Sequence, residues 1–211
     1  MTLSAMISLM DELMHVYQHF ATGGTIDSEW IPEHDTAETR SVSTSAEYLA
    51  WITKLYSLEG IKSTTLALKD SRAVSIDDRK KFAASVVESA ADRVLVTSGT
   101  YLMPEIARHI ANHVLSDSYK SMNKRIVITG ALIPMKDFEM SDGGFNLGMS
   151  IALLGENRIP VPSVIAAVNG QALPAKNLEK DLTTATFAKE EENEILGYDE
   201  YLIVPAGGTI D

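Results

Sequence analysis

Short apolar runs alternate along the chain with segments whose apolar residues repeat at helical spacing. The runs predict six strands: His15–Ala21, Ser63–Leu68, Arg93–Val96, Arg125–Thr129, Ser163–Val168 and Tyr201–Val204. The helical segments are Ala46–Tyr56, Ile76–Ala90, Pro104–Leu115 and Asn146–Leu154. Strands that alternate with helices in this way indicate an α/β fold: a doubly wound, mostly parallel sheet with helices on both faces, in three Rossmann-like layers.

A helix start signal and a long polar segment refine this pattern. Ser75 precedes the segment that begins at Ile76, and Asp78 follows three residues later, which is a capping-box pattern with Asp in place of Glu. The stretch Asp27–Ser45 is rich in Asp, Glu, Ser and Thr. It is too long for a tight connector, and loops of this length are usually functional lids or disordered segments. The sequence leaves both interpretations open.

Composition and charge exclude several classes of protein. The length of 211 residues favours a single domain over residues 1–211. The chain carries 18 basic and 29 acidic side chains, a net charge of −11, whereas contact with nucleic acid needs clustered Lys and Arg. It has no cysteine, which excludes a disulfide scaffold, zinc–thiolate sites and a cysteine nucleophile. No apolar run approaches the ~20 residues that span a bilayer and no basic leader starts the chain, so we expect a soluble, cytoplasmic protein that binds neither nucleic acid nor membrane.

The chemistry of a doubly wound sheet is expected where its strands end, because ligands bind outside the carboxyl ends of the strands. A Gly-Gly turn follows the first predicted strand, and two strand ends place a threonine directly after a glycine, at Thr25 and Thr100. Glycine lets the backbone approach a ligand, and the next hydroxyl then projects into the crevice. The Gly-Gly turn matches neither the dinucleotide pattern G-x-G-x-x-G nor a P-loop, so nucleotide binding is the weaker hypothesis. By itself the turn is also consistent with plain chain reversal.

Five motifs follow one another along the chain. They are Thr22–Ile26 (TGGTI), Ser98–Thr100 (SGT), Thr129–Ala131 (TGA) with Pro134, Ser141–Asn146 (SDGGFN), and Asn169-Gly170 followed by Lys180. In this order and spacing they resemble the L-asparaginase family, over about His15 to Phe187. The resemblance is to the amino-terminal, catalytic domain of that family. Because the chain is too short for the second domain of the longer members, we expect the short, single-domain type.

The resemblance implies an amidohydrolase that cleaves the side-chain amide of asparagine, or of a related small amide, to the acid and ammonia. Thr25 would be the nucleophile and form an acyl-enzyme, supported by Thr100 and Lys180. Ser71 would bind the substrate α-carboxylate, and the backbone around Thr25 and Ala131 would lie near the scissile amide. The substrate-binding set is Gly24, Ser71, Gly99, Tyr101, Ala131 and Trp30. We expect no metal and no other cofactor, and, because family members associate, a homodimer or homotetramer.

Each assigned residue also has a purely structural interpretation. Thr25 and Thr100 are suited to cap the turns or helices that follow them. Lys180 stands in a polar stretch of the kind where most lysines are solvated. Ser71 belongs to an Asp-Ser pair, which is common in turns. Without the five motifs in register, none of these residues would point to catalysis.

Two departures from the family pattern bear on activity. Tyr101 stands where family members usually carry an aspartate that engages the substrate α-amino group and completes a triad with the lysine. A phenol cannot replace the charge-assisted hydrogen bond of a carboxylate, roughly 1.5–3 kcal/mol. Trp30 replaces the family's loop tyrosine and has no hydroxyl to pass a proton. Three outcomes stay open: compensation by Glu29, Asp27 or a carboxylate of a partner subunit, an amide substrate without an α-amino group, or a non-catalytic module that binds an amino acid as a sensor.

Two histidine pairs and one repeat lie outside these motifs. His109 and His113 have the i, i+4 spacing that can chelate a metal, but no third ligand is evident, and solvated or capping roles are favoured. His15 and His19 share one face of a predicted strand and are expected at the edge of the core. The sequence Gly-Gly-Thr-Ile-Asp recurs at Gly207–Asp211, through coincidence or as the start of a second copy of the motif.

Overall fold

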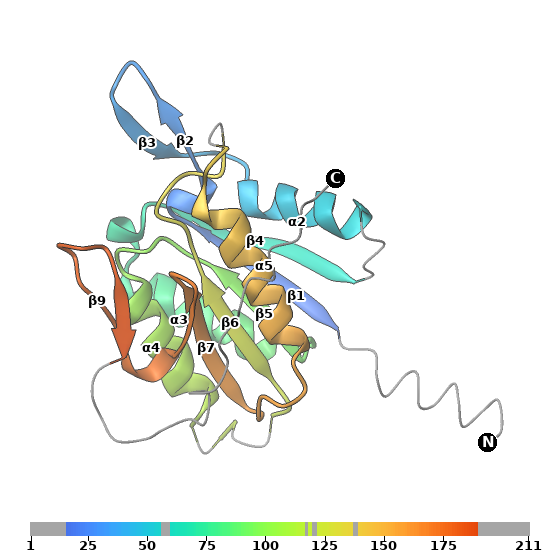
Figure 1. Ribbon diagram of the computed structural model, residues 1–211. Coiled ribbons are helices and arrows are strands. Elements are labelled where there is room, and N and C mark those ends of the chain that lie inside the picture. Colours follow the sequence, from blue (N-terminus) through green and yellow to red (C-terminus); the bar gives the residue numbers. More distant parts are fainter. Residues whose placement is uncertain (1–15, 56–59, 117, 120–121, 137–138, 190–211) are drawn as a thin grey trace.

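The main sheet has six strands and is parallel except at one edge. The computed structural model describes residues 16–55, 60–116, 118–119, 122–136 and 139–189. The strands of the sheet are β1 (Tyr17–Gly23), β4 (Ile61–Lys69), β5 (Arg93–Thr97), β6 (Arg125–Thr129), β7 (Ser163–Val168) and β8 (Gln171–Pro174). They lie in the order β4-β1-β5-β6-β7-β8, and only β8 runs antiparallel to its neighbour (Figure 1).

Helices cover both faces of this sheet. They are α2 (Thr44–Leu55), α3 (Ile76–Glu88), α4 (Met103–Val114) and α5 (Asp142–Gly155). One core cluster joins Phe82 of α3 and Ile106 of α4 to Val94 and Val96 of β5, whereas Leu95 of the same strand belongs to a second cluster with residues of α2 and α5. Because successive side chains of a strand point to opposite faces, α3 and α4 cover one face and α2 and α5 the other. This confirms the predicted three-layer α/β fold.

Local sequence signals located several elements accurately. The bounds of β6 and β7 are those predicted, and α3 begins at Ile76. Its capping box is complete: the backbone N–H of Asp78 donates to Ser75 Oγ (3.1 Å), and the backbone N–H of Ser75 donates to Asp78 Oδ2 (2.9 Å). The predicted strand Tyr201–Val204 and the repeat Gly207–Asp211 lie outside the described residues, as do His15 and Tyr56.

The polar stretch Asp27–Ser45 is an ordered hairpin rather than a disordered loop. Strand β2 (Ser28–Ile31) pairs antiparallel with β3 (Thr36–Thr39), and the hairpin projects from the body of the molecule (Figure 1). Asp35 occupies the connecting turn with a positive φ of 50°, a conformation that Asp adopts more readily than most residues. The two strands were not predicted because most of the hairpin faces solvent, so its residues are polar and show no apolar alternation.

Besides β2 and β3, three further short strands were not predicted. Besides β8, these are β9 (Leu178–Lys180) and β10 (Phe187–Lys189), which form a separate antiparallel pair in which Lys180 stands opposite Phe187. Strands of three or four residues are too short to show a period of two clearly. No helix in the described part of the chain is long and apolar enough to cross a bilayer.

Candidate functional site

The order of the strands predicts a ligand site, here called the crevice, between the carboxyl ends of β1 and β5. From β1 the chain passes to β4 on one side and then to β5 on the other, so the direction of winding reverses at β1. In sheets of this kind, ligands bind where the order reverses. The turn after β1 carries Thr25 and the turn after β5 carries Thr100. The topology therefore brings the two predicted threonine segments to one crevice.

Glycines allow the strand ends at this crevice to touch. Gly24 has φ 87° and ψ −171°, a region almost exclusive to glycine, and a Cβ there would lie 2.0 Å from the Cα of Gly99. A Cβ on Gly99 would in turn lie 2.6 Å from the Cβ of Ser71. The ends of β1, β5 and β4 thus pack directly on one another. Thr25 and Thr100 each follow one of the two touching glycines.

Lys180 reaches this crevice from a distant part of the sequence. Its Nζ donates a hydrogen bond to Thr100 Oγ1 at 2.9 Å and lies 5.4 Å from the ring centre of Phe187. Burial lowers the pKa of the Lys180 ammonium, because the charged form loses hydration. Within the described ranges no carboxylate forms an ion pair with it. The Lys180 amine is therefore partly buried and bonded to Thr100, and it is not a fully solvated surface lysine.

The capping interpretations of the two threonines do not hold. Gly24, not Thr25, is the N-cap of the 3-10 turn η1 (Thr25–Asp27), and that cap has no side-chain hydrogen bond. Leu102, not Thr100, is the N-cap of α4, again without a side-chain bond. Thr25 is partly exposed, and its hydroxyl has no hydrogen-bond partner among the residues that the structure describes. Both hydroxyls are thus available for chemistry.

Ser71 opens the short turn η2 (Ser71–Ala73) and is 4% exposed. The preceding carboxylate, Asp70, is engaged by Arg72: it accepts from the Arg72 backbone N–H at 2.8 Å and from its Nη2 at 2.7 Å. These bonds lower the pKa of the Asp70 carboxyl. Asp70 therefore fixes the turn and leaves the Ser71 hydroxyl beside Gly99.

Three further residues of the predicted substrate-binding set are Ala131, Tyr101 and Trp30, and their surroundings differ. Ala131 is buried after β6, and a Cβ on the preceding Gly130 would lie 3.2 Å from Thr100 Cγ2, so this turn also borders the crevice. Tyr101 is 46% exposed, and its phenol adds a small electrostatic effect to that of Asp70 in raising the pKa of Arg72. Trp30 lies on the projecting strand β2, opposite Ala37, and is 37% exposed.

A buried hydrogen-bonded network lies next to the crevice, and the sequence did not predict it. Its members are Asp27, Ser43, Ser45, Thr97 and His19. Asp27 Oδ1 accepts from Ser43 Oγ (3.0 Å), the backbone N–H of Ser45 (2.8 Å) and Ser45 Oγ (2.9 Å). Ser45 Oγ lies 3.1 Å from Thr97 Oγ1, which lies 2.9 Å from His19 Nε2. Burial raises the pKa of the Asp27 carboxyl and lowers that of His19 to about 3, so the imidazole is neutral.

Asp27 and Glu29 are the two carboxylates of this chain named in one of the three open outcomes, compensation for Tyr101. Asp27 bonds to serines at the start of α2, and Glu29 lies 3.7 Å from Arg40. Neither forms an ion pair with Lys180. The only advance signal for the network was the position of Asp27 directly after the TGGTI motif, because Ser45 and Thr97 lie far away in the sequence.

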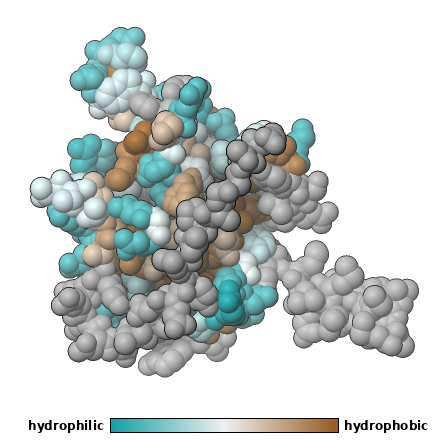
Figure 2. Space-filling view, in the orientation of Figure 1, coloured by the Kyte–Doolittle hydropathy of each residue, from teal (hydrophilic) through white to brown (hydrophobic). Residues whose placement is uncertain are grey.

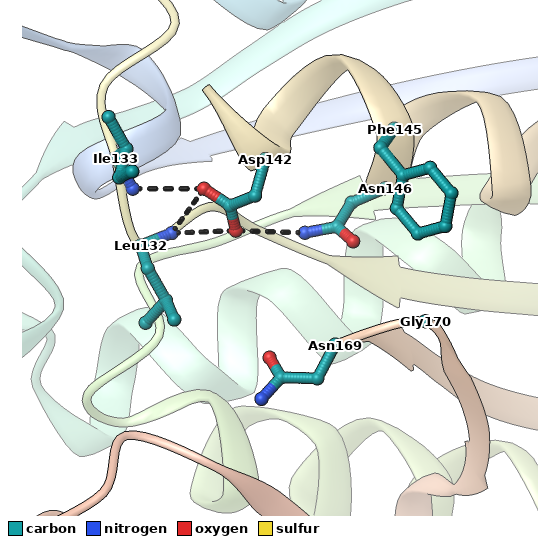
Figure 3. Close-up of a pocket in the computed structure, with 7 residues that line it drawn as sticks. All are labelled: Leu132, Ile133, Asp142, Phe145, Asn146, Asn169 and Gly170. Atoms are coloured by element: carbon teal, nitrogen blue, oxygen red, sulfur yellow. Dashed lines mark hydrogen bonds between the residues drawn. The ribbon is translucent and has the colours of Figure 1, made fainter. Parts of the chain in front are cut away.

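A second hollow of about 490 Å³ lies further along the same edge of the sheet (Figure 3). It is lined by Leu132, Ile133, Asp142, Phe145, Asn146, Asn169 and Gly170. The Asp142 carboxylate accepts from the backbone N–H groups of Leu132 and Ile133, each at 3.0 Å, and from Asn146 Nδ2 at 3.2 Å. Asp142 and Asn146 thus fasten the turn after β6 to the start of α5, which is the structural role of the SDGGFN motif.

The predicted histidine pair on α4 does not form a metal site with other described residues, among which no group of three or more potential ligands occurs. The His113 ring lies against Tyr119, with ring centres 5.4 Å apart. His19, the described member of the other pair, belongs to the buried network and not to the edge of the core.

Comparisons with known proteins agree with the fold described above. The family model described as "Asparaginase, N-terminal" matches residues 19–199. The fold is similar to that of a probable cytoplasmic L-asparaginase from Campylobacter jejuni, with a TM-score of 0.67 and 24% sequence identity over 83% of this chain and 53% of that one. This chain therefore spans about half the length of that protein. No curated protein matches the sequence.

Proposed function

We propose that this chain, which belongs to the asparaginase family, is an amidohydrolase that cleaves the side-chain amide of asparagine or a related small amide to the acid and ammonia. The observation that carries the proposal is the 2.9 Å hydrogen bond from Lys180 Nζ to Thr100 Oγ1, in the crevice that Thr25 also borders. A threonine hydroxyl is a weak nucleophile until a neighbouring group accepts its proton. A partly buried lysine with a lowered pKa is suited to that task.

In the proposed reaction, Thr25 Oγ1 attacks the carbonyl carbon of the amide. The hydroxyl proton passes by way of the Thr100 hydroxyl to the neutral amine of Lys180, as the oxygen–carbon bond forms. The carbon–nitrogen bond then breaks, and the leaving nitrogen takes a proton from the same relay and departs as ammonia. Water attacks the resulting ester, the acid is released and the Thr25 hydroxyl is restored.

Two other groups have roles in this scheme. Backbone N–H groups in the turns around Thr25 and Ala131 are the candidates for stabilising the negative charge that develops on the carbonyl oxygen. The Ser71 hydroxyl, beside Gly99, is the candidate for binding a carboxylate of the substrate. Gly24 and Gly99 contribute through their backbones, because each permits the close approach of the strand ends.

An assay of ammonia release tests the proposal directly. Asparagine, glutamine and simple primary amides are the substrates, and Thr25→Ala is compared with the wild-type protein and with Thr22→Ser. Thr22 lies three residues earlier, at the end of β1, and its hydroxyl donates to the carbonyl oxygen of Thr97, so the conservative change retains that bond. We expect Thr25→Ala to lose activity and Thr22→Ser to keep it. Equal residual rates in Thr25→Ala and wild type would reject Thr25 as the nucleophile.

We also propose that the active form is a homodimer or homotetramer. Several large apolar side chains are exposed beside the second hollow: Leu132, Ile133, Met140 and Phe145. Figure 2 shows apolar areas among the polar ones on the face that carries α5 and β7. Exposed apolar patches often mark contacts between proteins. Light scattering coupled to gel filtration measures the oligomeric state, and a monomer at assay concentration would contradict this expectation.

A non-catalytic amino-acid-binding module is the alternative. It is favoured by the phenol of Tyr101 beside Thr100 and by the lack of a carboxylate partner for Lys180 in the described part of the chain. Calorimetry followed by recovery of the ligand separates the two functions. A ligand that binds and is recovered unchanged supports the sensor, whereas conversion to the acid and ammonia excludes it.

A further inference from the structure

The carboxylates near the crevice have partners of their own, whereas Lys180 has no carboxylate partner among the described residues. Asp70 binds Arg72 at 2.7 Å, Glu29 lies 3.7 Å from Arg40, and Asp27 Oδ1 accepts from Ser43 and Ser45. The other oxygen, Asp27 Oδ2, is buried without a hydrogen-bond partner in the part of the chain that the structure describes. Glu105, in the first turn of α4, forms no ion pair with Lys180, and one of its oxygens is buried without a partner. Among the described residues, the Lys180 amine contacts the Thr100 hydroxyl and the Phe187 ring. No described carboxylate is thus directed to the crevice.

This arrangement disfavours an ammonium group on a bound ligand. Transfer of an ammonium from water to a protein site is costly unless an anion compensates it. No described carboxylate is available in this crevice to compensate such a group. The free amino acid asparagine, which carries such an ammonium, is therefore a poor match for the described side chains.

The same side chains suit a ligand with a carboxylate. Besides Thr25, two hydroxyls without a hydrogen-bond partner among the described residues belong to the strand ends at the crevice, on Ser71 and Tyr101, and each can donate to a carboxylate oxygen. The Ser71 hydroxyl lies beside Gly99, two residues before Tyr101, so the ends of β4 and β5 meet at this point. Hydroxyl groups that donate to a carboxylate form charge-assisted hydrogen bonds.

We propose that the substrate is a primary amide that carries a carboxylate but no α-ammonium group, such as the monoamide of a four-carbon dicarboxylic acid. This inference rests on the proposed function, because the same Thr25 would attack the amide. Succinamate is the simplest member of the class. It differs from asparagine only by a hydrogen in place of the α-ammonium group, so comparison of the two isolates the effect of that charge.

The test compares kcat/KM for succinamate and L-asparagine in the wild-type protein and in two variants at one position. Tyr101→Asp places a carboxylate beside Thr100, and Tyr101→Asn is the control of equal size without the charge. In the wild type we expect succinamate to be preferred by at least about tenfold, equivalent to one charged interaction. Tyr101→Asp should lower this preference by about tenfold or more, and Tyr101→Asn should leave it within about threefold. Circular dichroism confirms that each variant is folded.

Binding to Thr25→Ala separates failure of this inference from failure of the proposed function. Calorimetric titration of that variant with both compounds should give tighter binding of succinamate. Equal or tighter binding of asparagine, or no binding of succinamate, overturns the inference whether or not the wild type hydrolyses either compound. Tighter binding of succinamate without ammonia release from wild type supports the inference about the ligand and rejects the hydrolase.

Discussion

Two polar clusters lie within a few residues of each other at the same edge of the sheet, and they are built in opposite ways. In the buried network, Asp27 Oδ1 accepts three hydrogen bonds, and Thr97 Oγ1 lies within hydrogen-bond distance of both Ser45 and His19. In the crevice, Thr25, Thr100 and Lys180 share one described hydrogen bond. Asp27 is two residues from Thr25, and Thr97 is three residues from Thr100.

The difference matches the division of roles that we propose, between residues that hold the turns and residues that react. A buried polar group without partners costs free energy, so the lower cluster gains stability from its many bonds. A nucleophile and its base must exchange partners with a substrate, so few bonds within the protein would favour the roles proposed for Thr25, Thr100 and Lys180. The lower cluster ties the turn after β1 to α2 and β5, and in this way it holds Thr25 in position.

The largest expected effect on the free energy of unfolding comes from Gly24→Ala, which affects both clusters. Its Cβ would lie 2.0 Å from the Cα of Gly99, in a backbone conformation almost exclusive to glycine. We expect a loss of at least about 3 kcal/mol together with loss of activity. Urea unfolding and the ammonia assay measure the two effects. Gly148→Ala, where a Cβ would meet nothing within 4 Å, is the matched control.

Asp27→Ala should destabilise the protein nearly as much by disrupting the lower cluster. It removes the acceptor of three hydrogen bonds from Ser43 and Ser45 and leaves their donors buried. We expect a loss of about 3 kcal/mol in urea unfolding. Asp27→Asn retains one acceptor oxygen and should lose less. Equal stability of Asp27→Ala and wild type would show that the network does not hold the turn.

His19 makes the stability of the lower cluster depend on pH. Burial lowers its pKa in the folded state from 6.5 to about 3, so below pH 6.5 the unfolded chain binds a proton that the folded protein does not. Stability from this group is therefore lost as the pH falls, by about 2 kcal/mol between pH 7 and pH 5. The raised pKa of Asp27 has the opposite sign, because its folded form binds the extra proton on acidification.

Comparison with His19→Gln isolates the contribution of the histidine. Glutamine can still hydrogen-bond but does not titrate, so urea unfolding of the variant should show a weaker loss of stability between pH 7 and pH 5. The same loss in variant and wild type would mean that His19 is protonated in the folded protein, in conflict with its burial.

Lys180→Met should have the smallest effect on stability and a large effect on activity. Its amine makes one described hydrogen bond, to Thr100, and partial burial of the charge is itself unfavourable. We expect the free energy of unfolding to change by less than about 1 kcal/mol, while kcat falls by about 100-fold or more. Loss of stability as large as that of Asp27→Ala would place Lys180 among the residues that hold the fold.

Much of this architecture could be predicted from sequence. The bounds of β6 and β7 and the capping box at Ser75 depend on local patterns, which act over a few residues. The hairpin β2–β3 could not be predicted in this way, because solvent-facing strands lack an apolar period. The contact of Lys180 with Thr100 was expected only through the resemblance to a family, since a lysine in a polar stretch gives no local signal.

The sequence by itself determined the α/β rhythm and the placement of a Gly-Thr pair at the ends of two strands, because hydrophobic period and glycine chemistry are local properties. Only the tertiary structure decided which side chains became partners. Thr100 and Lys180 are 80 residues apart, and Ser45 and Thr97 are 52 apart. Such contacts depend on the order of the strands in the sheet and on the packing of Gly24 against Gly99. Local sequence preferences specify neither.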